Sequence, residues 1–333
     1  MDTLVIFSNG DQPEPPPDDE TIENGDTVEI SGSGFGTGPK VLLYEPFAAS
    51  LPGNPARGSW ELDARPAPVY DKEVKHSGAG ASRFDYGTSS NTWWGGYLHK
   101  IAAYDQTYYQ SYWWRHNASS LASDGVCKIN QWHGNSGQGD FAPGWMNGSS
   151  AGGWMTYASR ENGTTTGDDG SHWWSANNQN MMNQPNKWRH IEMFGKQSSA
   201  AGVADGSIDF RVDGVSMKKL NSIVTRTTSS RWSETSFMHG GNVNAGTPKS
   251  MWVDEFYFQA GTQRVTLEQG SLVVPQAPNV WADGRVEFTA FLGGLAPGDV
   301  ACRIYNAGGT VVKEQPCEIV VIKRHRHRRH HRF

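Results

Sequence analysis

Aromatic rings and polar side chains occur together in several short segments, in a combination suited to binding sugars. Residues 108–116 read Tyr-Tyr-Gln-Ser-Tyr-Trp-Trp-Arg-His, and alternate residues of a strand share one face. Sugars bind such faces through ring stacking and a few oriented hydrogen bonds. The same rings could instead fill the space between two sheets. The candidate glycan-binding residues are Tyr112, Trp114, Trp132, His133, His190 and Glu192.

Two strands that would position part of this set show strict alternation. Residues 189–193 and 207–212 alternate apolar and polar side chains, which predicts strands with one buried face. The loop 195–206 between them is small and polar, and Asp213-Gly214 predicts a tight turn. The apolar positions predicted to be buried are Ile191, Met193, Ile208, Phe210 and Val212.

These strands, with the segment 251–258, resemble the late strands of concanavalin-like jelly rolls. That family includes legume-type lectins, laminin-G-like modules and several polysaccharide lyases. The shared pattern is Trp-x-x-Ile-Glu at 188–192, Asp-Gly-x-Ile-x-Phe-x-Val-Asp-Gly at 205–214, and a closing strand containing Asp254. The resemblance spans about residues 41–268 and implies an all-β fold, an antiparallel β-sandwich of the jelly-roll type.

Gln131 and His133 are two residues apart and therefore share one face of a strand. Gln-x-His resembles a catalytic pair of alginate-lyase-type jelly rolls. In that family a Gln or Asn and an Arg neutralise the uronate carboxylate, and a His or Tyr removes the adjacent proton. The set implied here is Gln131, His133, Arg115 and Tyr157, with Tyr112 and His190 as further candidates.

Other motifs of the catalytic relatives are absent. The Arg-x-Glu-Leu and Tyr-x-Lys-x-Gly-x-Tyr-x-Gln motifs of the lyases do not occur, nor does the Glu-x-Asp-x-x-Glu strand of the jelly-roll glucanases. Without the last, paired-carboxylate glycoside hydrolysis is not expected. A non-catalytic glycan-binding role is therefore preferred, and a uronate lyase acting by β-elimination is the alternative.

The same resemblance implies one structural calcium ion, bound where the first and last strands meet. The matching positions are Glu45, the backbone of residues 77–80, and Asp254. Calcium takes about six to eight oxygen ligands, so two carboxylates with backbone carbonyls form a reasonable set. Alternatively, both acids are ordinary surface residues.

A second resemblance concerns the two ends of the chain. The run Gly-x-Thr-Val-x-Ile-x-Gly-x-Gly-Phe-Gly at 25–36 resembles the opening of TIG-type immunoglobulin-like domains. Residues 281–288 and 305–312 resemble the middle strand and last hairpin of that family. The predicted organisation is one immunoglobulin-like sandwich (21–42 and 270–322) split by a jelly roll (43–269), preceded by a strand with a Pro-rich linker (1–20) and followed by a basic tail (323–333).

Composition and charge limit the remaining possibilities. The 333 residues include 39 Gly, as in a turn-rich β protein. No apolar run is long enough to span a membrane. The last eleven residues carry six Lys or Arg, whereas the whole chain has a formal charge of −5. This tail predicts at most non-specific contact with nucleic acid.

The N-terminus lacks the layout of a signal peptide, and the segment 2–8 could add to a sheet of another subunit. We therefore expect a protein made in the cytoplasm and displayed on a particle, such as a virion, where it works outside the cell. Among the three cysteines, Cys302 and Cys317 flank a predicted hairpin and form either a disulfide or two buried thiols.

Overall fold

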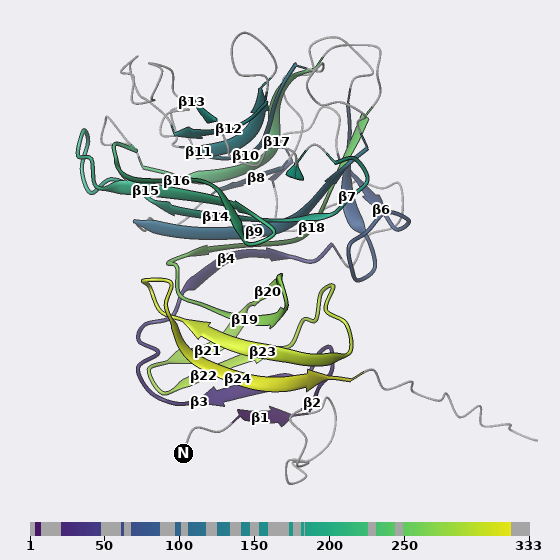
Figure 1. The fold of residues 1–333 in the computed structure, drawn as a ribbon, viewed down its shortest axis with the longest axis vertical. Helices are drawn as coiled ribbons and strands as arrows, with labels where there is room; N and C mark the ends of the chain where they lie inside the picture. Colours follow the sequence, from purple (N-terminus) through teal and green to yellow (C-terminus); the bar gives the residue numbers. More distant parts are fainter. Residues whose placement is uncertain are drawn as a thin grey trace, which may run out of the picture.

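The computed structural model describes residues 4–7, 21–47, 61–62, 68–86, 97–100, 106–117, 125–133, 141–146, 153–158, 173–175, 181–182, 184–225, 231–243 and 249–320. These residues form an all-β protein in which a larger and a smaller sandwich are stacked along the long axis (Figure 1). No helix in these ranges is long and apolar enough to cross a membrane.

The larger sandwich consists of two antiparallel sheets. The seven-stranded sheet has the order β13-β12-β11-β10-β17-β8-β5. Its strands are β5 (Glu61–Leu62), β8 (Tyr97–Lys100), β10 (Gly125–His133), β11 (Phe141–Met146), β12 (Gly153–Ala158), β13 (Trp173–Ser175) and β17 (Glu234–Val243).

The eight-stranded sheet has the order β16-β15-β14-β9-β18-β7-β6, and β4 pairs with the second half of β18. Its strands are β4 (Lys40–Glu45), β6 (Val69–Asp71), β7 (Ala81–Tyr86), β9 (Thr107–His116), β14 (Arg189–Lys196), β15 (Gly206–Val212), β16 (Val215–Ile223) and β18 (Lys249–Ala260).

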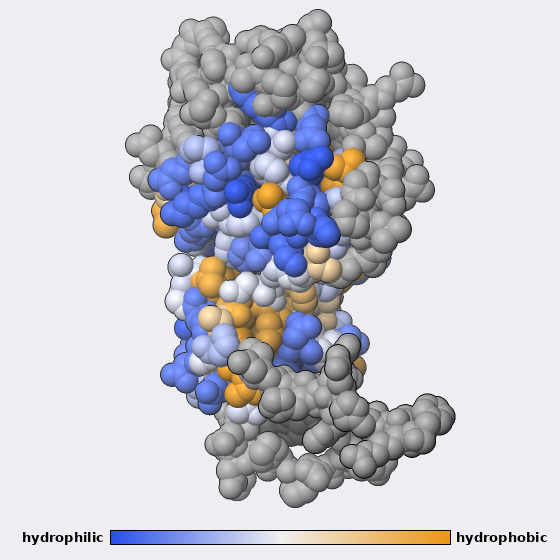
Figure 2. Space-filling view, turned by 90° about the vertical axis from the view of Figure 1, so that its right-hand side faces the viewer, coloured by the Kyte–Doolittle hydropathy of each residue, from blue (hydrophilic) through white to orange (hydrophobic). Residues whose placement is uncertain are grey.

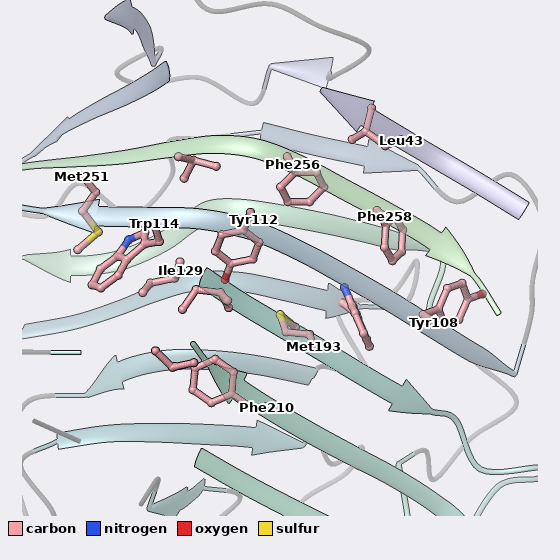
Figure 3. Packing of buried hydrophobic residues seen from close by; sticks show 14 of the residues in the cluster. Leu43, Tyr108, Tyr112, Trp114, Ile129, Met193, Phe210, Met251, Phe256 and Phe258 are labelled. Carbon is pink, nitrogen blue, oxygen red and sulfur yellow. The ribbon is translucent and has the colours of Figure 1, made fainter. Parts of the chain in front are cut away.

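The main core lies between these two sheets. Figure 3 shows side chains of β9, β14, β15 and β18 that point toward the seven-stranded sheet, among them Tyr112, Phe210 and Phe258. The strand alternation predicted at β14 and β15 is confirmed, because Ile191, Met193, Ile208, Phe210 and Val212 are all buried. Asp213 and Gly214 make the turn between β15 and β16, both with positive φ, as the Asp-Gly pair predicts.

The smaller sandwich combines strands from both ends of the described chain. One sheet has the order β1-β3-β22-β21 and the other β2-β24-β23-β19-β20. The strands are β1 (Leu4–Phe7), β2 (Thr21–Ile22), β3 (Thr27–Ser31), β19 (Arg264–Gln269), β20 (Leu272–Gln276), β21 (Pro278–Ala282), β22 (Arg285–Thr289), β23 (Gly298–Tyr305) and β24 (Val311–Ile319).

The boundaries between the sandwiches differ from the predicted ones by one strand segment on each side. β19 pairs with β23, so the smaller sandwich takes up the chain again at Arg264, and β4 already belongs to the larger sandwich from Lys40. The chain passes between the sandwiches through residues 32–39, just before β4, and through residues 261–263, just after β18.

The N-terminal strand is paired within the chain, and its docking to another subunit stays a prediction. β1 pairs antiparallel with β3 of the same chain, with Leu4 opposite Ile30, and so covers an edge that would otherwise be open. Cys302 and Cys317 are buried thiols in the core of the smaller sandwich and are not joined in a disulfide. The Pro-rich linker and the basic tail 323–333 lie outside the described residues.

Candidate functional site

The buried residues of β10 determine which positions of this strand face outward. Asn130 and Trp132 are buried: Asn130 Nδ2 donates to the Ser236 carbonyl at 2.8 Å, and Trp132 Nε1 donates to Gln110 Oε1 at 2.7 Å. Since neighbouring residues of a strand point to opposite faces, Gln131 and His133 occupy positions on the outer face of the seven-stranded sheet.

Strand register extends this outer face toward β8. His133 lies opposite Glu234 of β17, and Glu234 lies opposite Lys100 of β8. Directly opposed residues of an antiparallel pair share a face. The positions of His133, Glu234 and Lys100 therefore form one row across three neighbouring strands.

Register also brings in Tyr157 from the other direction. Phe141 of β11 lies opposite Trp132 and so occupies a core-facing position, whereas Ala142 lies opposite Tyr157 of β12. The position of Tyr157 is therefore on the outer face, two strands from β10, or about 10 Å at the usual strand spacing. Gln131 and His133 on β10 and Tyr157 on β12 thus occupy positions on either side of the start of β11.

The residue types at these positions are ones that recognise polar ligands. An amide offers two donors and an acceptor, and a neutral imidazole and a phenol each donate and accept. The neighbouring row holds an acidic and a basic residue type, at the paired positions of Glu234 and Lys100. Such a set can hold hydroxyl or carboxylate groups, and the imidazole or the phenolate can also accept a proton.

Three of the predicted glycan-binding rings are not on this face. Tyr112, Trp114 and Trp132 are no more than 1% exposed and belong to the main core. The reason is alternation, because the even-numbered positions of β9 point between the sheets while Trp113 and Arg115 point the other way. The prediction that these three rings stack on sugars is therefore wrong, and the alternative, that they fill the core, holds.

Arg115 is separated from the Gln131 and His133 positions by the whole core. It lies on the outer face of the eight-stranded sheet, where its Nη2 donates to Asn186 Oδ1 at 3.3 Å. Its guanidinium also lies 5.6 Å from the ring centroid of Trp252. Arg115 therefore cannot join these residues around one substrate, and the four-residue lyase set is reduced to three.

His190 and Glu192 lie on that same outer face but are covered. Both are almost fully buried, and Tyr109 Oη donates to Glu192 Oε1 at 3.0 Å. Burial also lowers the pKa of His190, as desolvation disfavours the charged imidazolium. A polysaccharide cannot reach these two side chains in this structure, contrary to the prediction.

The two predicted calcium ligands lie on paired strands but make different contacts. Asp254 accepts hydrogen bonds from the backbone N–H groups of His76 (2.9 Å), Ser77 (3.2 Å) and Glu255 (2.9 Å). Glu45 of β4 accepts one from the Phe47 N–H at 2.8 Å. Burial, together with the neighbouring Glu255 charge, raises the pKa of Asp254 to about 8, and burial raises that of Glu45.

These contacts fit calcium only in part. Both acids are desolvated, which suits a metal, but the loop after β6 directs amide N–H groups at Asp254 rather than carbonyl oxygens. No group of three or more His, Cys, Asp or Glu side chains positioned to hold a metal occurs in the described part of the chain. One calcium ion therefore remains a prediction.

Sequence reasoning missed a cluster around Glu255. The His76 ring stacks on Trp113, with centroids 3.6 Å apart and planes at 12°. Its Nδ1 lies 2.8 Å from Glu255 Oε1, which also accepts a hydrogen bond from Ser77 Oγ. This arrangement depends on an irregularity of β18 after Asp254, and no sequence pattern marks it.

Comparison with known proteins gives structural similarity only. No family model and none of the curated proteins matches the chain. Similar solved structures include an endo-β-1,4-glucuronan lyase from the fungus Trichoderma reesei (11% identity, covering 66% of this chain and 95% of that chain, TM-score 0.48). Alginate lyase vAL-1 from Chlorella virus (14%, 61% and 93%, TM-score 0.46) and the cellulose induced protein Cip1 (13%, 60% and 90%, TM-score 0.41) are others. At these identities and TM-scores, none of them assigns a family or an activity to this chain.

Proposed function

We propose that this protein binds a polysaccharide on the outer face of the seven-stranded sheet without cleaving it. The observation that carries the proposal is the register of β8, β17, β10, β11 and β12, which gathers the positions of Gln131, His133, Tyr157, Glu234 and Lys100 on one face. Amide, imidazole, phenol and charged groups are the polar set that orients sugar hydroxyl and carboxylate groups.

The extent of this face suits a polymer better than a small molecule. Seven neighbouring strands span about 29 Å at roughly 4.8 Å per step. Polar positions occur on four of them, β8, β10, β12 and β17, so contacts are spread along the sheet and not gathered at one point. A chain of several sugar units would touch them together.

Cleavage is the second candidate, and a specific observation favours it. The β-elimination of a uronate polymer requires an amide that binds the carboxylate and an imidazole or phenolate that accepts the proton. The positions of Gln131, His133 and Tyr157 share one face, so these residue types could act on one substrate. In that reaction the base removes the proton next to the carboxylate, and the glycosidic oxygen leaves with the bonding electrons, giving an unsaturated sugar. Binding alone is preferred because Arg115, the cation of the predicted set, lies on the other sheet.

The proposal includes display of several copies on a particle surface, such as a virion, outside the cell. One face of this kind binds weakly, and linked copies raise the overall affinity by about 10²–10⁴-fold through effective concentration. Fractionation of the native source tests this part: we expect the protein in the particle fraction, and a free monomer would refute display.

The binding proposal is tested with uronate-containing and neutral polysaccharides in affinity electrophoresis, with the ultraviolet absorbance of unsaturated sugars followed in parallel. We expect retardation without product, weakened by Gln131→Ala and His133→Ala. The matched control is Arg115→Ala, which removes a polar side chain from the other sheet and should leave retardation unchanged. Product formation that His133→Ala abolishes would establish the lyase instead, and the absence of binding to every polymer would refute both.

A further inference from the structure

A small pocket lies at the junction of the two sandwiches, on the side of the eight-stranded sheet that faces away from the main core. In Figure 1 this is the layer where β4 runs between β9 and β18 above and β19 and β20 below. Four polar residues line the pocket, each from a different strand: Tyr44, Ser111, His190 and Glu255. Phe291 of the smaller sandwich is part of the wall that closes it.

Two of these side chains have buried polar atoms without a protein partner. Tyr44 Oη and His190 Nδ1 are shielded from solvent and make no hydrogen bond within the described residues, and His190 is only 1% exposed. An unsatisfied buried polar atom costs about 1–3 kcal/mol. Both residues line the same pocket.

Glu255 contributes a negative charge with one oxygen to spare. Its Oε1 is engaged by His76 and Ser77, whereas no described residue bonds to its Oε2. A Cβ atom at Gly293 would lie 2.7 Å from this Oε2, so the glycine leaves space next to the carboxylate. Glu255 itself has a φ of 51°, an unfavourable value for a residue with a side chain. Strained backbone of this kind is often found at functional sites.

All four polar groups can accept hydrogen bonds. Burial lowers the pKa of His190, so its imidazole is neutral and one ring nitrogen can accept, while carboxylate and hydroxyl oxygens accept as well. Burial, together with the charge of Glu255, raises the pKa of Tyr44, and the Glu255 carboxylate gives the site a negative charge. An acceptor-rich, negative site favours a cation that carries several donors.

The remaining lining is apolar or aromatic. Trp113, Tyr257 and Phe291 contribute rings, and Tyr44 meets Phe291 edge to face at a centroid distance of 5.7 Å. Ring faces attract cations. The free space holds about one water-sized group, which excludes a whole sugar but admits the head group of a longer molecule. Figure 2 shows hydrophobic residues on the smaller sandwich just below this junction and mainly hydrophilic ones above it.

We propose that this junction pocket binds a primary ammonium group. Such a group has three N–H donors for Glu255 Oε2, Tyr44 Oη and His190 Nδ1, and a positive charge that matches the carboxylate. A water molecule of similar size offers only two donors and no charge. The pocket lies on the opposite side of the larger sandwich from the proposed polysaccharide face, so the two sites are independent.

Thermal unfolding of the full-length protein in methylammonium chloride tests the proposal, with sodium chloride and tetramethylammonium chloride at equal concentrations as references. We expect a saturable rise in Tm of about 2–4 °C at roughly ten times the Kd with methylammonium only. Tetramethylammonium has the charge but no N–H donor. An equal rise with either reference salt would overturn the proposal, and no rise at all would show that the pocket holds only water.

Variants assign the effect to this pocket. Glu255→Gln keeps the size of the side chain and removes its charge, and Tyr44→Phe removes one acceptor, so both should lose most of the shift. Glu314→Gln is the matched control on an exposed strand and should retain it. If Glu255→Gln does not fold, Tyr44→Phe decides alone, and a shift that persists in it would place the amine elsewhere. Glucosamine and an Nα-blocked lysine, compared in the same assay, distinguish an amino sugar from a lysine side chain as the source of the group.

Discussion

Replacing Trp132 by alanine tests whether its ring stabilises the core or binds sugar. Trp132 is fully buried. Its ring centroid lies 5.4 Å from that of Trp232, 5.9 Å from Phe258 and 6.0 Å from Tyr108. Removing a large core ring costs about 3–5 kcal/mol. The hydrogen bond to Gln110 is lost too, but Thr235 still donates to the same Gln110 oxygen at 3.0 Å, so this loss adds only about 1 kcal/mol.

The measurement is urea unfolding followed by far-ultraviolet circular dichroism, with polysaccharide retardation assayed separately below the unfolding transition. Trp132→Ala should lower the free energy of unfolding by about 4–6 kcal/mol, and Trp132→Phe by less, because a ring remains. Trp132→Phe should bind polysaccharide like the parent protein. Val280→Ala, at an exposed residue, is the control and should stay within about 0.5 kcal/mol. A loss under about 1 kcal/mol for Trp132→Ala, or lost binding in a stable Trp132→Phe, would refute a core role.

Four further predictions concern charges and the strand edge. The pKa of Asp254 is about 8 in the folded chain against 3.8 normally, so between these values the folded state holds a proton that the unfolded state has lost, and stability should fall as pH rises. Asp254→Asn should flatten this trend between pH 5 and 8 in urea unfolding; an unchanged slope would contradict it. If calcium binds Glu45 and Asp254, adding it at pH 8 should raise Tm in the parent but not in Asp254→Asn, whereas equal Tm values with calcium and with a chelator would reject the metal. The guanidinium of Arg264 links the sandwiches, because it lies 3.8 Å from the ring centroid of Tyr305 and 5.2 Å from that of Tyr109. Arg264→Ala should therefore lower the free energy of unfolding by about 1–2 kcal/mol. A decrease below about 0.3 kcal/mol in urea unfolding would exclude that link. Deleting residues 1–8 should open the edge of β3 and cause concentration-dependent association in sedimentation, and a strictly monomeric deletion variant would contradict this.

Local alternation made part of the fold predictable. In β14 and β15 one face is apolar and the other polar, so burial of Ile191 and Phe210 could be predicted without knowing their neighbours. The same reasoning placed Gln131 and His133 two apart on one strand face. It could not say which face this was, because that depends on where Trp132 packs in the assembled sandwich.

The errors arise where both faces of a strand are covered. In β9, Tyr112 and Trp114 are buried in the main core, while Tyr109 and Trp113 are buried on the other face. A strand buried on both sides does not alternate, so its sequence shows no preference for either face. On that other face Arg264 of the smaller sandwich lies over Tyr109, and His76 of the loop after β6 stacks on Trp113. Both covering residues are far from β9 in the sequence, so no local pattern predicts them.

The smaller sandwich is built from strands near both ends of the chain, and this determines the order in which its strands can pair during synthesis. Asn24 Oδ1 accepts a hydrogen bond from the Leu292 N–H, 268 residues later, and β3 pairs with β22. At a ribosomal rate of about 5–20 residues per second, β3 waits roughly 10–50 s for this partner. During that time β1, already synthesised, can cover one of its two edges. We therefore expect the N-terminal strand to keep one edge of β3 from pairing with other strands until β22 has been synthesised.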